Sequence, residues 1–361
     1  MYILTTRHTM RLHVLLWIPA ILAVFSSSIY AAPPNPSEYP VKDKLPTANP
    51  AWSTHILKGL PNTPPNPKPM TTFDFSKDVT RCRDNHVWGL SFDDGPAPFT
   101  DHLLAELDKR SVKASFFVVG SRVLERPDVL LRTYQAGHHI AMHTWSHPHL
   151  TTVSSNQIIA EVVYTAMIIK QVIGVTPRFI RAPYGDIDTR VRTILQRMGL
   201  IIAAWNEDSG DAGGVKTVAQ RFLARANAGI VPIISLQHDL FVESERQAPG
   251  AMDAILSGRG KYKIQAVDTC IGESPYDEGF WSRLDGTKGS EPTANENTAG
   301  AVAGGTEGRA ESATQPTTST ENPHQSTSAS NTSKSSTIAI APFMAKSVFS
   351  LLLSALLIFS V

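Results

Sequence analysis

Ser91-Phe92-Asp93-Asp94-Gly95-Pro96 is the most informative stretch of this 361-residue chain, together with His143-Thr144-Trp145-Ser146-His147 further along. Each stretch lies at the end of a short apolar run. A mononuclear metal hydrolase needs side chains of this kind: the first stretch has two adjacent carboxylates, and the second has two imidazoles four residues apart. Both donor types suit a divalent ion such as zinc. One carboxylate can bind the ion while its neighbour stays free to accept a proton. The two stretches together predict a metal-dependent hydrolytic site.

Each motif alone has a simpler interpretation. Asp-Asp-Gly-Pro is typical of a turn that ends a strand, because Gly and Pro interrupt regular structure and Asp tolerates turn conformations. A His-x-x-x-His pair alone is more often two polar surface residues than a metal site. Their joint occurrence, each at the carboxyl end of an apolar run, favours the metal site.

Short apolar runs alternate with longer amphipathic segments through the middle of the chain. The runs that we expect to form strands are 87–92, 114–119, 139–143, 178–182, 201–205, 230–236 and 263–267. The segments that we expect to form helices include 99–110, 155–173, 188–198 and 215–228. This alternation predicts parallel strands joined by right-handed crossovers, and hence an α/β fold. A closed or nearly closed barrel is favoured, and an open doubly wound sheet is the alternative.

Polar clusters follow five of the expected strands. In either architecture, functional groups gather at the carboxyl ends of parallel strands, so we expect these clusters to share one rim. They are Asp93-Asp94, His143 to His147, Arg181 to Gly185, Asn206 to Asp211, and His238-Asp239. The sequence contains neither a glycine-rich phosphate loop nor a G-x-S-x-G elbow, so nucleotide binding and serine esterase chemistry lack support. We expect no nucleic-acid partner and a monomer.

The amino-terminal end predicts secretion. Residues 1–31 contain Arg7 and Arg11, then the apolar run 14–25, then small residues up to Ala31. This order is typical of a secretory signal peptide, and a retained signal anchor is the alternative.

The carboxyl-terminal end, residues 337–361, predicts membrane attachment. Its apolar tail, 348–361, would reach only about 21 Å as a helix, short of the roughly 30 Å hydrocarbon core. Small residues precede the tail, as in a glycosylphosphatidylinositol (GPI) attachment signal that is removed from the mature protein. The candidate attachment residues are Asn331, Ser333 and Ser335. An ordinary transmembrane anchor is the alternative, and both place the body of the protein outside the cytoplasm.

Composition divides the rest of the chain into three parts. Residues 32–77 are rich in proline and asparagine and predict an extended lead-in. Residues 281–336 are rich in Ser and Thr and almost without aromatic residues, which predicts an O-glycosylated stalk that cannot bury a core. Residues 78–280 remain as one globular domain of ordinary size.

Two cysteines, Cys82 and Cys270, lie near opposite ends of that domain. In an oxidising compartment such a pair is most simply a disulfide that joins the ends of the fold. Two free thiols that bind a metal are the less favoured alternative, because neither cysteine is close to another candidate ligand in the sequence.

The succession of motifs resembles the polysaccharide deacetylase family (carbohydrate esterase family 4, the NodB homology domain), and most of all its secreted fungal chitin deacetylases. The resemblance covers roughly residues 80–272. It is carried by the two stretches quoted first, by Arg181-Ala182-Pro183-Tyr184-Gly185 and by Leu236-Gln237-His238. It implies a distorted (β/α)7 barrel and a divalent metal, usually zinc and in some members cobalt. The implied reaction removes N-acetyl groups from the N-acetylglucosamine units of chitin, giving chitosan and acetate.

The resemblance also implies roles for the residues at the rim. Asp94, His143 and His147 would bind the metal. Asp93 would be the general base, and His238 would be the general acid that protonates the leaving amine. The chemistry of the residues agrees, because amide hydrolysis needs both an acid and a base near neutral pH.

Further residues would support this machinery. Arg181 would orient the base, and Asp211 would hold the His238 imidazole. The backbone N–H of Tyr184 would stabilise the oxyanion, Leu236 would help form the acetyl pocket, and Pro183 would lie at the substrate site.

One departure from the family pattern concerns Ala212, because the family usually has tryptophan after Asp-x-x-Asp. Trp205 or Trp145 are the candidates for a replacement aromatic wall, and a core position is the alternative for each. The resemblance implies a protein held at the outer face of the plasma membrane or in the cell wall. Alternative functions are a wall-anchored carbohydrate-binding or structural protein with little activity, or a related deacetylase acting on xylan or peptidoglycan.

Overall fold

The computed structural model of the chain describes residues 33–287. The expected signal peptide, the expected attachment signal and the three candidate attachment residues lie outside the described residues, as does nearly all of the expected stalk. No helix within residues 33–287 has the length and apolar character needed to cross a membrane.

Parallel strands form one sheet in the described part of the chain. They are β1 (Val87–Asp93), β2 (Ser115–Val118), β3 (His139–Met142), β4 (Phe179–Ile180), β5 (Ile201–Ile202), β6 (Glu207–Asp208), β7 (Ile233–His238) and β8 (Lys263–Gln265). The order is β5-β4-β3-β2-β1-β7-β6, and β8 pairs with the start of β1. Every residue of β1 is buried, because the sheet is covered on both of its faces.

The sheet is curled, and the length of one connection requires this. β5 and β6 are the two ends of the strand order, yet only residues 203–206 join them. Five residue steps span at most about 18 Å, whereas seven flat strands would be about 29 Å across. The sheet therefore bends round on itself, and Val79 forms a parallel bridge with Ala203 at the β5 edge. The expected distorted barrel is confirmed over the open doubly wound sheet.

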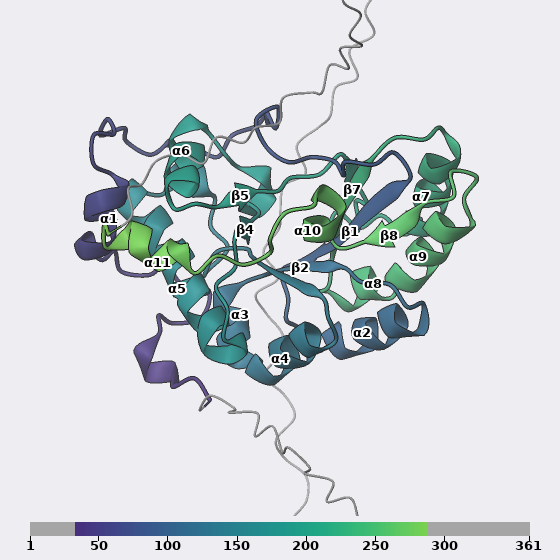
Figure 1. The fold of residues 1–361 in the computed structure, drawn as a ribbon, viewed down its shortest axis with the longest axis horizontal. Coiled ribbons are helices and arrows are strands. Elements are labelled where there is room, and N and C mark those ends of the chain that lie inside the picture. The colour runs from purple at the N-terminus through teal and green to yellow at the C-terminus, as the bar shows by residue number, and fades with distance from the viewer. Residues whose placement is uncertain (1–32, 288–361) are drawn as a thin grey trace, which may run out of the picture. The chain divides into compact units, whose positions relative to one another are not determined.

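Helices surround the outside of the curled sheet (Figure 1). They are α1 (Pro50–Ile56), α2 (Thr100–Lys109), α3 (Gly120–Glu125), α4 (Pro127–Gln135), α5 (Ser155–Ile173), α6 (Thr189–Arg197), α7 (Val218–Asn227), α8 (Val242–Glu245), α9 (Ala248–Ser257), α10 (Val267–Ile271) and α11 (Gly279–Leu284). Short 3₁₀ turns lie at Pro36–Glu38, Leu150–Thr152 and Pro183–Gly185. The longest helix, α5, covers the predicted range 155–173, because Ser154 and Gln157 form a capping box and Gly174 ends the helix in a left-handed conformation.

Two apolar cores result from the alternation of side chains along the strands. One lies inside the curl and includes Phe117, Phe179, Ile234 and both cysteines. The other lies between the sheet and the helices and includes Leu90, Ile140 and Ile233. The inner core fills the curl below the carboxyl ends of the strands, and the predicted polar clusters lie above it at those ends.

The lead-in differs from the expected extended segment. Residues 50–56 form α1, whose first turn is capped by the Asn49 side chain and begins at Pro50. Ile56 is fully buried in the outer core, and Trp52 packs against that core. The sequence does not predict α1, because this helix is short and lies in a proline-rich stretch with few apolar residues. At the other end, α11 continues four residues past the expected boundary at residue 280.

A disulfide joins Cys82 and Cys270, as the sequence predicts, with Cα atoms 5.0 Å apart. Both cysteines are buried in the inner core. The bridge attaches the segment that precedes β1 to α10, which follows β8.

Removing this bridge should destabilise the domain. The chain-entropy treatment assigns at most about 5 kcal/mol to the cross-link, whose two cysteines are separated by 188 positions. We expect the variant with both Cys82→Ala and Cys270→Ala to lose up to about 5 kcal/mol in free energy of unfolding, measured by urea denaturation. Chemical reduction of the unmodified protein is the control, and it should give a similar loss. An unchanged free energy would contradict the expectation.

Candidate active site

The predicted polar clusters share one cavity at the carboxyl ends of the strands. Asp93, the last residue of β1, is the register partner of His238, the last residue of β7. The cavity has a volume of about 390 Å³. Its lining comprises Asp93, Asp94, Arg122, His143, His147, Ala182, Tyr184, Trp205, Asp208, Ala212, Leu236, His238, Leu240 and Phe241.

Adjacent carboxylates reach the same cavity because the backbone turns between them. Consecutive side chains of a strand point to opposite faces, which would separate Asp93 from Asp94. Asp94, however, has a left-handed conformation with a φ of 80°. The turn at the end of β1 therefore brings both carboxylates to the cavity, as the pair of roles requires.

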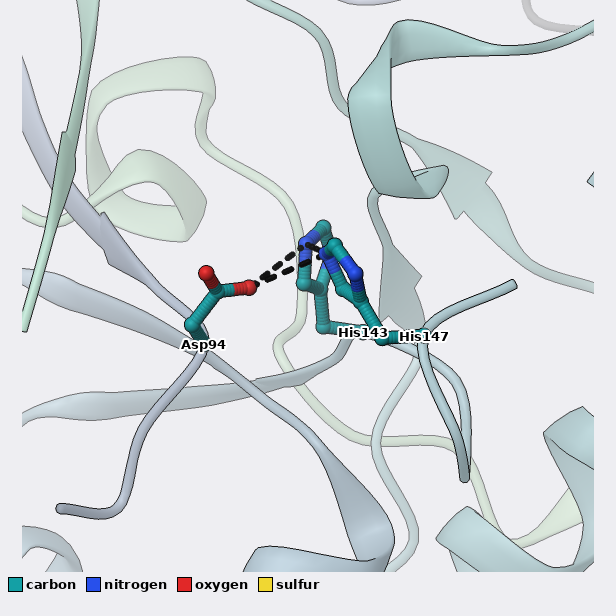
Figure 2. A group of neighbouring side chains, drawn as sticks. All are labelled: Asp94, His143 and His147. Atoms are coloured by element: carbon teal, nitrogen blue, oxygen red, sulfur yellow. Dashed lines mark hydrogen bonds and ion pairs between the residues drawn. The ribbon is translucent and has the colours of Figure 1, made fainter. Parts of the chain in front are cut away.

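Asp94, His143 and His147 form a compact group of potential metal ligands, which Figure 2 shows with their polar atoms facing one another. Asp94 Oδ1 lies 3.1 Å from His147 Nε2 and 3.5 Å from His143 Nε2. The two Nε2 atoms are 3.2 Å apart. Asp94 Oδ1 is also buried without a hydrogen-bond donor. An orphaned carboxylate oxygen facing two imidazole nitrogens fits a divalent cation.

The His143 ring is held in the form that a metal ligand needs. Its Nδ1 lies 2.9 Å from the carbonyl oxygen of Arg181, so Nδ1 carries the hydrogen and donates it. Burial lowers the pKa of His143 well below its usual range, so the ring is neutral. The lone pair of Nε2 consequently faces Asp94 and His147, because the carbonyl oxygen on the other side of the ring fixes the tautomer.

Left-handed backbone conformations are concentrated at this site. Several non-glycine residues of the described chain have a positive φ. Those that lie at or beside the cavity are Asp94, Thr144, His147 and Tyr184. Such conformations cost of order 1–3 kcal/mol each and persist only where surrounding contacts enforce them. The ligand geometry is therefore imposed by the fold.

The buried guanidinium of Arg181 holds Asp93. Arg181 Nη1 donates to Asp93 Oδ1 at 2.7 Å and to Ser91 Oγ at 2.9 Å. Its Nε and Nη2 donate to the carbonyl oxygens of Ala203 and Ala204. Burial raises the pKa of Asp93 to about 6, although Arg181 and then His238 act to lower it. The carboxylate is thus a base that works near neutral pH.

A second carboxylate holds His238. Asp211 Oδ1 lies 2.7 Å from His238 Nδ1, and Asp211 Oδ2 accepts the backbone N–H of His238 at 2.8 Å. Burial acts to lower the pKa of His238, but the hydrogen bond and the charge of Asp211 outweigh it, and the pKa rises to about 9. Because His238 Nδ1 is hydrogen-bonded to Asp211, Nε2 is the nitrogen that can interact with a molecule in the cavity.

Only some of the residues expected at the substrate site line the cavity. Tyr184 and Leu236 line it, whereas Pro183 is buried and does not. Of the two candidate aromatic walls, Trp205 lines the cavity and Trp145 is fully buried in the outer core.

Three cavity residues were missed by the sequence analysis. Arg122 Nη1 donates to the backbone oxygen of Asp94 at 2.7 Å, and nothing in the sequence around Arg122 signals this contact. Leu240 and Phe241 follow the His238 cluster directly, so the rim position of that cluster could have indicated them. His149, two residues past His147, is partly exposed and stacks on the Tyr184 ring.

Comparison with known proteins places this geometry in a family. The model of the polysaccharide deacetylase family matches residues 80–203. Chitin deacetylase 1 of Cryptococcus neoformans var. grubii is 40% identical over 219 residues, which are 54% of this chain and 46% of the relative. A chitin deacetylase of Amylomyces rouxii is 43% identical over 148 residues, covering 41% of this chain and 35% of the relative. The chain thus spans less than half the length of these relatives.

A solved structure extends the comparison to the fold. The chitin deacetylase of Colletotrichum lindemuthianum superposes with a TM-score of 0.51 at 28% identity, covering 55% of this chain and 95% of that one. The family match includes the carboxylate pair, both histidines and Arg181, and the curled parallel sheet is the shared framework. Residues 80–203 thus match the polysaccharide deacetylase family, and the chain is similar to fungal chitin deacetylases over part of its length.

Proposed function

We propose that the protein is a metal-dependent chitin deacetylase, which hydrolyses N-acetyl groups of N-acetylglucosamine units to give chitosan and acetate. One observation carries the proposal: the cavity holds a set of metal ligands, a carboxylate with a pKa of about 6 and an imidazole with a pKa of about 9. Amide hydrolysis at neutral pH needs that combination of base and acid. The names of the similar fungal proteins support chitin as the substrate.

Asp94, His143 and His147 would hold the metal. Their nitrogen and oxygen donors suit zinc, and cobalt accepts the same ligands. When bound, such an ion polarises a carbonyl group and makes water more acidic.

Asp93 acts as the base in this proposal. Its Oδ2 lies 3.7 Å from His143 Nε2, so the free oxygen faces the ligand group while Arg181 occupies Oδ1. Asp93 takes a proton from the attacking water, whose oxygen bonds to the acetyl carbonyl carbon. The oxyanion that forms there accepts a hydrogen bond from the backbone N–H of Tyr184, an interaction worth several kcal/mol in comparable sites.

His238 acts as the acid. It carries its proton at neutral pH, because Asp211 stabilises the imidazolium. Cleavage of the carbon–nitrogen bond gives nitrogen the proton of His238, so that an amine leaves and acetate remains. Leu236, buried beside the cavity mouth, would contact the acetyl methyl group.

The ends of the chain supply the proposed location. A cleaved signal peptide and a GPI anchor attached near Asn331, Ser333 or Ser335 would hold the enzyme at the outer face of the plasma membrane or in the cell wall. There a monomer would meet chitin as it is laid down.

Acetate release from defined chito-oligosaccharides tests the proposal. A chelator should abolish release and added zinc should restore it. Asp93→Asn should lower kcat by about 10²–10⁴ while the protein keeps its metal, because only the proton acceptor is removed. His143→Ala should instead lose the metal, measured by elemental analysis. Full activity in metal-replete Asp93→Asn, or no acetate from the unmodified protein with zinc, would refute the assignment.

The pH dependence of kcat tests the role of Asp211. Its negative charge raises the pKa of His238, so Asp211→Asn should lower that pKa by about 1–3 units. The alkaline limb of the kcat profile should then move to lower pH, because the acid loses its proton earlier. Asp208→Asn, which changes another carboxylate of the cavity lining, is the control and should leave that limb in place. An alkaline limb unmoved in Asp211→Asn would exclude His238 as the acid.

Phe241 offers a test of the substrate wall. It lines the same cavity as Ala212 and is half exposed, so a sugar ring can pack on it. Phe241→Ala should raise KM about 10-fold with little change in kcat, because an aromatic contact of about 1–2 kcal/mol is lost. Phe241→Tyr should restore KM, and Leu256→Ala, at an exposed apolar residue of α9, is the control. Equal KM values in Phe241→Ala and the unmodified enzyme would exclude this contact.

A further inference from the structure

A buried carboxylate outside the cavity binds the loop that carries the two histidines. Glu161, in the interior of α5, is fully buried. Its Oε2 accepts the backbone N–H groups of Trp145 at 2.7 Å and Ser146 at 2.8 Å. Its Oε1 accepts the Ser146 hydroxyl at 2.6 Å. All three donors lie between His143 and His147.

The remaining polar groups of this loop are fixed by α3 and by the loop itself. Gly120 N–H donates to the Thr144 oxygen at 2.9 Å, and Ser121 N–H donates to the Trp145 oxygen at 3.1 Å. The N–H of His147 donates to Thr144 Oγ1 at 3.1 Å. A Cβ at Gly120 would lie 2.8 Å from the Trp145 ring, so α3 approaches the loop as closely as it can.

The loop needs an acceptor for its N–H groups because it cannot turn them to water. Trp145 is fully buried, which anchors the loop in the outer core. Thr144 and His147 both have left-handed conformations, with φ values of 67° and 60°. Such conformations persist only where contacts enforce them. Within the described chain, Glu161 provides the acceptors that hold the two N–H groups between these residues.

We infer that Glu161 is a positioning residue for metal binding, which fixes the loop so that the Nε2 atoms of His143 and His147 face Asp94 (Figure 2). The inference rests on the metal site of the proposed function. Glu161 does not line the cavity, so it acts on an ion only through the backbone of the loop.

Zinc affinity of the full chain tests this inference, measured by competition with a chromophoric chelator. Glu161→Leu should raise the zinc Kd about 10- to 100-fold, the usual effect of losing a group that orients a metal ligand. Glu161→Gln should stay close to the unmodified protein. Burial raises the pKa of Glu161 to about 7, and an amide can accept the two N–H groups while donating to Ser146 Oγ.

Thr165→Val is the matched control. Thr165 is fully buried one turn further along α5, and its hydroxyl donates to the Glu161 backbone oxygen rather than to a group of the loop. This variant should lower the midpoint of thermal unfolding but leave the zinc Kd unchanged. A Kd in Glu161→Leu equal to that of the unmodified protein, or raised no more than in Thr165→Val, would overturn the inference.

Ser146→Ala keeps the test decisive if Glu161→Leu does not fold. It removes one of the three hydrogen bonds and should weaken zinc binding by about 2- to 5-fold. An unchanged Kd in that variant would also overturn the inference. If the unmodified protein itself fails to bind zinc, the proposed function fails instead, so the two failures are distinguishable.

Discussion

The ion pair between Arg181 and Asp93 is the interaction on which the rest of the site depends. Burying a cation costs several kcal/mol unless its hydrogens are paired. Here Asp93, Ser91 and two carbonyl oxygens beyond β5 accept them, and the guanidinium lies 3.9 Å from the centre of the Phe117 ring. The same residue accepts the His143 Nδ1 hydrogen with its own carbonyl. One buried residue, through its side chain and its backbone carbonyl, therefore links the proposed base, a proposed metal ligand and the edge of the curled sheet.

Different partners set the pKa values of His238, the proposed acid, and Asp93, the proposed base. Asp93 is more buried than an ordinary carboxylate and is held by a cation, whereas His238 is held by the Asp211 carboxylate. A divalent cation beside them would lower both pKa values, since positive charge favours ionised carboxylate and neutral imidazole. Asp93 would then be ionised over a wider pH range, and Asp211 would become more important for keeping a proton on His238.

The sequence predicts the parts of this site that depend on local pattern. Polar clusters next to strand ends indicated the rim, and the amphipathic pattern of 155–173 indicated α5, whose two ends are fixed by the capping box and Gly174. β4 and β5 fall within the predicted strands 178–182 and 201–205, whereas the two-residue strand β6 is too short to show a period and was not predicted. α1 was also not predicted, because it is defined by packing onto the domain. Glu161 lies within an apolar helical stripe, and its role depends on a loop that only the tertiary structure brings to it.

Burial is graded across the cavity, and the gradient suits a polymeric substrate. Asp93, Asp94 and His143 are almost fully buried, whereas the Tyr184 and Phe241 side chains are half exposed. Charged groups interact more strongly where water is excluded. Under the proposed function, the exposed aromatic rings would contact sugars and would have to remain open, because a long chain would enter and leave past them. Ala212 lines the same cavity, so the aromatic rings of the lining come from Tyr184, Trp205 and Phe241 and none comes from position 212.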